Sequence, residues 1–183
     1  MKGTVEILLG GTGGQGLGLA GVILAQALAE EEGKNVQETE AYGISMRGGM
    51  SRAEVMVSEE EINEIKVTAP DVLLAMSQPV ADIYIPKTKK AGIILVDSAF
   101  VKDIPPTEAR VFFLPLTQEA RDLGLEAAAN IVALGSIVSI SGILSKGSLE
   151  NTLRKKFSAS VVGINLKALE KGYDMGLREK GLA

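Results

Sequence analysis

The sequence predicts an α/β fold in which a mostly parallel sheet is flanked by helices, a Rossmann-like arrangement of three layers. Short apolar runs recur along the chain with helical or polar stretches between them, a pattern typical of parallel strands buried on both faces. A glycine-rich turn joins the first run to an apolar helix. The 183 residues are 46% hydrophobic, enough to bury the core of one domain. We therefore expect residues 1–183 to form a single domain.

The N-terminal elements are a strand, a helix and a second strand. Residues 5–9 form the first apolar run. Residues 17–32 contain no proline and are rich in alanine and leucine, which predicts a helix. Gly33 is a typical stop signal for that helix. Residues 36–39 then predict a short strand.

A hairpin is expected to interrupt the parallel pattern near residues 50–67. Apolar and polar side chains alternate in the second half of residues 50–57, as they do in a half-buried strand. Three glutamates at residues 59–61 form a polar turn. Residues 62–67 are therefore predicted to pair back on the preceding strand.

The C-terminal half returns to alternating strands and helices. Further strands are predicted at residues 72–75, 93–96 and 110–114. After Thr117 the chain becomes helical, with helices predicted at residues 127–145, 148–156 and 161–178.

The helix predicted at residues 127–145 has no charged side chain. Its length approaches that of a membrane span, but its many polar and small side chains favour a helix buried in protein. Gly135, Ser139 and Gly142 lie three or four residues apart, on one side of the helix. We expect another element to approach that side closely.

Composition excludes several classes of function. With 19 basic and 23 acidic residues, the net charge is -4, so no basic surface for nucleic acid is expected. The chain contains no cysteine and no histidine, which removes disulfides, a thiolate nucleophile, an imidazole base and the usual ligands of zinc or iron-sulfur clusters. No catalytic residue and no metal ligand is therefore predicted. The first strand begins without a leader peptide, which favours a cytoplasmic location.

The turn at residues 10–16, GGTGGQG, places five glycines among seven residues. Gly11, Gly13 and Gly16 match the pattern G-x-G-x-x-G, and Glu38 follows 22 residues after Gly16. In dinucleotide-binding folds, this pattern directs backbone N–H groups at a pyrophosphate and the acid at a ribose. Alternatively, the glycines only allow the helix to pack tightly against the sheet. A dehydrogenase would also need a substrate site with a proton donor, and this chain has neither a histidine nor the length for a second domain.

A second glycine-containing loop combines an aromatic ring, a guanidinium and a flexible backbone. Its candidate binding residues are Tyr42, Arg47, Gly48 and Gly49. Such a combination suits a phosphate, a carboxylate or an acidic group of a partner. In the alternative interpretation, Arg47 pairs with a nearby acid such as Glu40, and Tyr42 packs at the surface.

Two polar pairs follow predicted strands. Ser77 and Gln78 come after residues 72–75, and Asp97 and Ser98 after the next strand. The carboxyl ends of parallel strands form the edge where open α/β sheets bind ligands. The same side chains are also suited to capping the helix that follows, Ser77 in particular. Both roles remain open for them.

In four stretches, found in the same order, the chain resembles the gamma subunit of the 2-oxoacid:ferredoxin oxidoreductases. They are GGTGGQG at 10–16, AYGISMRGGMSRAEV at 41–55, PDVLLAMSQ at 70–78 and GIILVDSAFV at 92–101. The C-terminal pattern is similar as well, at Asn130, Leu134, Gly135, Asn165 and Ala168. Pyruvate-type gamma subunits commonly lead into the glycine turn with Arg-Trp-His-Gly. This chain has Leu-Leu-Gly-Gly at residues 8–11, which resembles the 2-oxoglutarate type more.

The resemblance implies a subunit of an oligomeric enzyme that decarboxylates a 2-oxoacid on thiamine diphosphate, forms an acyl-coenzyme A and sends electrons to ferredoxin. It also implies that the alpha, beta and ferredoxin-like delta subunits hold the thiamine diphosphate and the iron-sulfur clusters. The gamma chain itself would hold no cofactor but would help to bind coenzyme A as a substrate. Arg47 is then the expected contact for an anionic group.

The glycine turn, the second loop and the strand edge together supply the candidate ligand-binding residues. They are Gly11, Gly13, Gly14, Gln15, Gly16, Tyr42, Arg47, Gly48, Gly49, Ser77 and Gln78. Two other classes of function remain open. The chain could be a stand-alone protein that binds NAD or ATP, or an assembly module that binds no ligand.

Overall fold

The computed structural model describes residues 3–42, 49–64 and 66–181. Within them lies one mixed sheet with the strand order β2-β3-β1-β4-β5-β6. Strands β1, β4, β5 and β6 are parallel neighbours, whereas β3 is antiparallel to both β1 and β2. The strands are β1 (Val5–Thr12), β2 (Asn35–Tyr42), β3 (Met50–Ser58), β4 (Val72–Ala75), β5 (Ile93–Asp97) and β6 (Arg110–Leu114). The predicted α/β fold with a mostly parallel sheet is confirmed.

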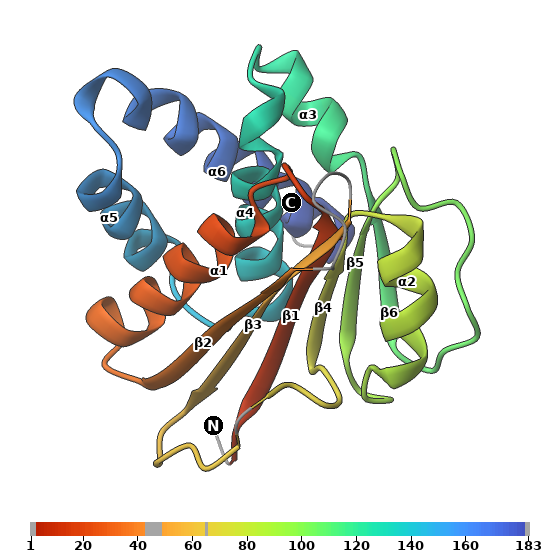
Figure 1. Cartoon of the computed structure of the whole chain (residues 1–183). Helices are drawn as coiled ribbons and strands as arrows, with labels where there is room; N and C mark the ends of the chain where they lie inside the picture. The colour runs from red at the N-terminus through yellow and green to blue at the C-terminus, as the bar shows by residue number, and fades with distance from the viewer. Residues whose placement is uncertain (1–2, 43–48, 65, 182–183) are drawn as a thin grey trace.

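Helices cover both faces of this sheet, so the molecule has three layers. Figure 1 shows α1, α4, α5 and α6 gathered over one face and α2 over the other. The α-helices are α1 (Leu17–Gln26), α2 (Gln78–Tyr84), α3 (Leu116–Asp122), α4 (Ala129–Ser141), α5 (Lys146–Lys156) and α6 (Ala159–Glu179). Short turns of other helix types extend three of them: η1 (Ala27–Glu31) after α1, η2 (Ile85–Lys87) after α2 and η3 (Glu126–Ala128) before α4.

Alternation along β1 assigns its side chains to two apolar cores. Ile7 and Leu9 belong to the larger core, which also contains the buried side chains of α1 and α4. Leu8 belongs to the smaller core beneath α2. All three side chains are fully buried. This burial on both faces is what the apolar runs of the sequence predict.

Helices α4 and α6 cross closely because both present glycines to each other. An added methyl group at Gly135 would clash with the backbone of α6, and one at Gly172 would clash with the backbone of Val132 in α4. The hydroxyl of Ser136 donates a hydrogen bond to the Gly172 carbonyl (2.9 Å). The close approach expected along α4 is therefore found, although Gly142 ends the helix in a left-handed conformation (φ 68°) instead of taking part in it.

α4 is shorter than the helix predicted at residues 127–145. Among the residues that the structure describes, no helix has both the length and the apolar character that crossing a bilayer requires.

The strand β3, which the sequence places in a hairpin near residues 50–67, pairs with other strands than predicted. β3 pairs along its length with β1 on one side and with β2 on the other. The described residues of the 62–67 segment form no strand. The prediction that this segment pairs back on β3 was therefore wrong, because β1 and β2 occupy both edges of β3.

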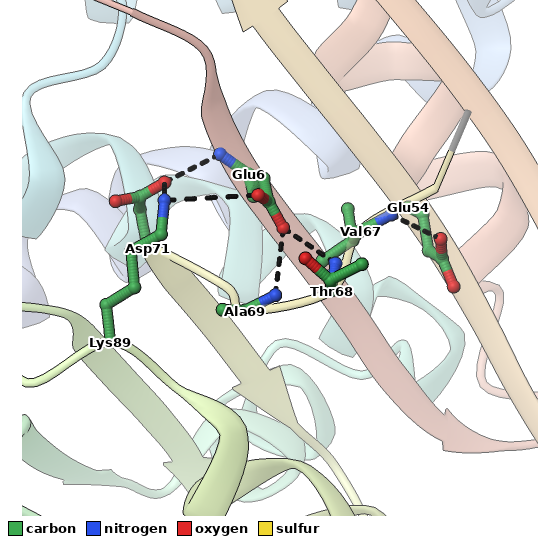
Figure 2. Close-up of polar contacts among 7 residues, drawn as sticks. All are labelled: Glu6, Glu54, Val67, Thr68, Ala69, Asp71 and Lys89. Carbon is green, nitrogen blue, oxygen red and sulfur yellow. Dashed lines mark hydrogen bonds and ion pairs between the residues drawn. The ribbon is translucent and has the colours of Figure 1, made fainter. Parts of the chain in front are cut away.

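Carboxylates hold this segment instead of a strand ladder (Figure 2). The Val67 N–H donates to Glu54 Oε2 at 2.9 Å. The N–H groups of Thr68 and Ala69 donate to Glu6 Oε2 at 2.7 and 2.9 Å. Side chains thus satisfy the backbone donors that would otherwise need a neighbouring strand.

The same network ties the segment to the start of β4. The Glu6 N–H donates to Asp71 Oδ2 (2.8 Å), and Lys89 Nζ donates to the same oxygen (2.7 Å). In Figure 2 the Lys89 ammonium lies between the carboxyl groups of Asp71 and Glu6. The loop that enters β4 is therefore held to the amino end of β1.

Candidate functional site

A pocket of about 400 Å³ lies at the carboxyl edge of the sheet. β2, the strand that follows β1 along the chain, lies on one side of β1 in the sheet, whereas β4 lies on the other side. The strand order therefore reverses at β1. In open α/β sheets, ligands bind outside such a reversal of strand order. The residues that line the pocket are Thr12, Gly14, Gln15, Met76, Phe100, Thr117, Glu126, Ala127 and Ala129.

The glycine turn forms one wall of the pocket. Gly14 and Gly16 have positive φ angles of 99° and 72°, a conformation that glycine adopts without strain. Gly16 is also the N-cap of α1, and no side chain caps this helix end. The first N–H groups of α1 have no partner inside the helix, which gives this end a positive partial charge.

Gln15 joins the two strands on either side of the pocket. Its Oε1 accepts a hydrogen bond from the Thr12 N–H (2.7 Å) at the end of β1, and its Nε2 donates to the Met76 carbonyl (3.0 Å) after β4. Gly11 leaves room for this side chain, since an added methyl group there would clash with the Gln15 amide. Gln15 therefore fixes the shape of the glycine turn while it lines the pocket.

Two buried polar atoms flank the turn without a hydrogen-bond partner among the described residues: Ser77 Oγ and Asn130 Oδ1. Ser77 is the N-cap residue of α2, but its side chain makes no capping bond. The other amide atom of Asn130, Nδ2, donates to the Gly16 carbonyl (2.8 Å). Neither Ser77 nor Asn130 is among the residues that line the pocket, so these two atoms carry no argument for a ligand.

The second loop begins and ends beside the glycine turn. The Gly13 N–H donates to the Gly49 carbonyl (2.9 Å), and the backbone of Tyr42 ends β2 at the same edge of the sheet. Gly49, at the end of the second loop, therefore lies beside the glycine turn, and the ligand role of the loop stays a prediction. Arg47, Gly48 and the Tyr42 side chain lie outside the described residues.

The remaining polar residues at this edge hold loops. Gln78 Oε1 accepts from the N–H groups of Lys102 and Asp103 at 2.8 and 3.1 Å. The buried Asp97 carboxylate accepts from Thr117 Oγ1 (2.5 Å) and from the Ala99 N–H (3.1 Å). Neither Gln78 nor Asp97 lines the pocket, but both fix the segments that do.

Sequence reasoning missed three polar or aromatic residues that line the pocket. Phe100 and Thr117 follow β5 and β6, so the same edge rule would have identified them. Glu126 lies in η3, which no sequence pattern placed at this edge. Arg121 donates two hydrogen bonds to the Glu126 carboxylate (3.0 and 2.9 Å) and lowers its pKa.

Glu38, the acid of the dinucleotide interpretation, does not lie at this edge. It pairs with Val55 of β3, and Val55 in turn pairs with Ile7 near the start of β1. β3 therefore separates Glu38 from β1, and the carboxylate lies against Gly21 of α1. Burial and the neighbouring Glu40 raise the pKa of Glu38. This geometry argues against a ribose contact of the dinucleotide type.

Fold and site together define an α/β protein with a pocket beside its glycine turn, at the point where its strand order reverses. A family described as pyruvate ferredoxin/flavodoxin oxidoreductase matches residues 6–175. The chain is also 38% identical over 173 residues to the 2-oxoglutarate synthase subunit KorC of Methanocaldococcus jannaschii, covering 93% of this chain and 92% of that subunit. The chain belongs to this oxidoreductase family and is most similar to its gamma subunits.

Solved structures agree with this assignment. The gamma subunit of a keto/oxoacid ferredoxin oxidoreductase from Geobacter sulfurreducens superposes with a TM-score of 0.86 at 37% identity, covering 96% of this chain and 98% of that one. The 2-oxoglutarate:ferredoxin oxidoreductase of Magnetococcus marinus, solved with 2-oxoglutarate, coenzyme A and succinyl-CoA, superposes with a TM-score of 0.87 at 25% identity. This superposition covers 100% of the present chain and 32% of the longer chain from M. marinus.

Within the family, the KorC type is favoured over pyruvate and ketoisovalerate types. The match to the KorC subunit of M. jannaschii is 38% identical, whereas the pyruvate synthase subunit PorC of Thermotoga maritima matches at 29%. The preference for the 2-oxoglutarate type that the Leu-Leu-Gly-Gly lead suggests is therefore supported by similarity along the whole chain.

Proposed function

We propose that this chain is the gamma subunit of a thiamine-diphosphate-dependent oxidoreductase that converts 2-oxoglutarate and coenzyme A to succinyl-CoA and passes the electrons to ferredoxin. In this proposal, the pocket at the glycine turn holds part of coenzyme A. Alpha, beta and ferredoxin-like delta subunits carry the thiamine diphosphate and the iron-sulfur clusters. The complex is cytoplasmic, and the isolated chain is inactive.

The main support for the coenzyme A role is the pocket between the ends of β1 and β4. Gly14 lines the pocket with open space beside it, and no side chain caps the adjacent N-terminus of α1. Uncapped N–H groups at a helix N-terminus suit phosphate oxygens. The homologous complex of M. marinus was solved with coenzyme A bound. The position of the pocket and the coenzyme A bound to this relative both support the proposal.

The chain's composition supports a division of labour among subunits. It has no cysteine or histidine with which to ligate a cluster. Among the described residues, no group of acidic side chains is arranged to hold a metal ion. The redox chemistry of the relatives therefore requires cofactors held elsewhere, and this chain contributes binding and assembly.

Arg47 provides a test of the ligand role in the complete complex. Replacing Arg47 by alanine removes a charge-assisted hydrogen bond to phosphate, so we expect the KM for coenzyme A to rise about tenfold. Arg154→Ala is the matched control, because this exposed arginine lies in α5, which packs on α1 and on η1 and does not line the pocket. A KM for coenzyme A that is unchanged in Arg47→Ala would remove the proposed contact without affecting the subunit assignment.

Copurification from the native source tests that assignment. The proposal expects partner subunits that contain thiamine diphosphate and clusters to accompany this chain. A stand-alone nucleotide-binding protein would instead purify as a monomer that binds NAD or ATP in calorimetry. An assembly module would purify with partners whose turnover is insensitive to changes in the pocket.

A further inference from the structure

An aromatic ring lines the pocket and is exposed to solvent. Phe100 follows β5, and 41% of its surface is accessible. The other large apolar side chains that are similarly exposed in the described part of the chain are Leu19, Ile83, Phe113 and Val161. None of these four lines the pocket. Because the sequence contains only four phenylalanines and three tyrosines, an exposed ring at this position is informative.

The backbone that carries Phe100 is rigid. The N–H groups of Phe100 and Val101 both donate to the Asp97 carbonyl, at 3.1 and 2.9 Å. The Asp97 carboxylate holds the intervening Ala99 N–H and the Thr117 hydroxyl, and Val101 is buried. Exposure of the ring is therefore not explained by a loose loop. The turn presents the ring to the pocket.

The other residues that line the pocket differ in their chemistry from one side to the other. Gly14 and Gln15 contribute the backbone and amide groups of the glycine turn, whereas Glu126 contributes a carboxylate. A carboxylate accepts hydrogen bonds but donates none when ionised, so it suits an amino group. Arg121 pairs with this carboxylate and favours its ionised form.

We infer that Phe100 and Glu126 form a subsite for an adenine base, in which the Phe100 ring stacks on the base and Glu126 accepts a hydrogen bond from its amino group. The phosphates of the same ligand then lie toward the glycine turn. This inference rests on the proposed coenzyme A role and adds the residues that select the nucleotide part of the ligand.

Two thiol substrates distinguish the contribution of the base to binding from that of the rest of the ligand. Coenzyme A carries the adenine nucleotide, and pantetheine is the thiol arm without it. In the complete complex, Phe100→Ala should raise the KM for coenzyme A about tenfold, because stacking of a base on an aromatic ring is typically worth this much. The kcat and the KM for pantetheine should not change. Phe100→Trp should restore the KM for coenzyme A.

Phe113→Ala is the matched control, because Phe113 is 49% exposed on the edge strand β6 and does not line the pocket. We expect it to leave both KM values unchanged. Adenosine 3′,5′-bisphosphate gives an independent readout as a competitive inhibitor, and Phe100→Ala should weaken its inhibition by the same factor as it raises the KM for coenzyme A.

An unchanged KM for coenzyme A in Phe100→Ala would overturn the base subsite. Equal increases for coenzyme A and pantetheine would also overturn it, because they would assign Phe100 to the shape of the pocket. In both cases Arg47→Ala still reports whether the chain binds coenzyme A, so the failure of the subsite is distinguishable from the failure of the proposed function. If the complex turns over coenzyme A normally without this chain, both proposals fail.

Discussion

The crossing of α4 and α6 yields a sharp prediction for stability. In Gly172→Ala the new methyl carbon would lie 2.7 Å from the carbonyl carbon of Val132 and closer still to its oxygen, whereas carbon atoms in contact settle about 3.5 Å apart. Because the neighbour is backbone, no side chain can rotate away, and the still closer contact with the Val132 oxygen requires the helices to separate by more than about 1 Å. Overpacking of this kind costs about 3 kcal/mol, against a gain in helix propensity of about 1 kcal/mol.

The expected net loss is therefore about 2 kcal/mol, or about 4–8 °C in Tm for a chain of this size. Gly163→Ala is the matched control, because Gly163 lies in the same helix with open space around it. It should gain about 1 kcal/mol from helix propensity alone. Urea denaturation of the three purified proteins measures both values. If Gly172→Ala proved as stable as Gly163→Ala, the close crossing would be refuted.

Two further predictions concern carboxylates. Because the pKa of Glu38 is raised in the folded chain above its usual 4.5, unfolding releases a proton above that pH and stability falls as pH rises through the window. The Glu38→Gln variant has no carboxyl group to titrate at this position, so its free energy of unfolding relative to that of the wild type, measured in urea, should rise between about pH 4 and about pH 7. A difference that does not change with pH would contradict the burial of Glu38. Glu6→Ala removes the acceptor of the Thr68 and Ala69 N–H groups, so exchange of these amides should accelerate about tenfold, with the amides of α4 unaffected as the internal control.

Much of the fold was predictable because local pattern and burial agree. The apolar runs that become β4 and β5 are buried on both faces of the sheet, and the run that becomes β6 is partly exposed at its edge. The apolar helix predicted after the glycine turn matches α1 and η1. The partner of β3 was not predictable in the same way. Its pairing with β1 is distant in sequence, and β2, which precedes it along the chain, took the other side of β3 in place of residues 62–67.

The site was predictable at the level of loops more than of side chains. Of the candidate residues that glycines and strand ends indicate, Gly14 and Gln15 line the pocket, and their contact with a ligand stays a prediction. They do not reveal that Gln78 is used to hold another loop, because its partners lie about 25 residues away in sequence. Glu126 escaped notice for the same reason, since only tertiary packing brings η3 to the glycine turn.

The position of β3 has a consequence for the order in which the chain can assemble. Neighbouring strands lie about 4.8 Å apart, so without β3 the strands β1 and β2 would border a gap about 10 Å wide, under α1. All eight residues of β1 and all eight of β2 find their register partners on β3. During synthesis neither strand can complete its pairing on this side until Ser58 has been made. This side of the sheet is therefore completed only after a later segment has been made that lies between two earlier ones.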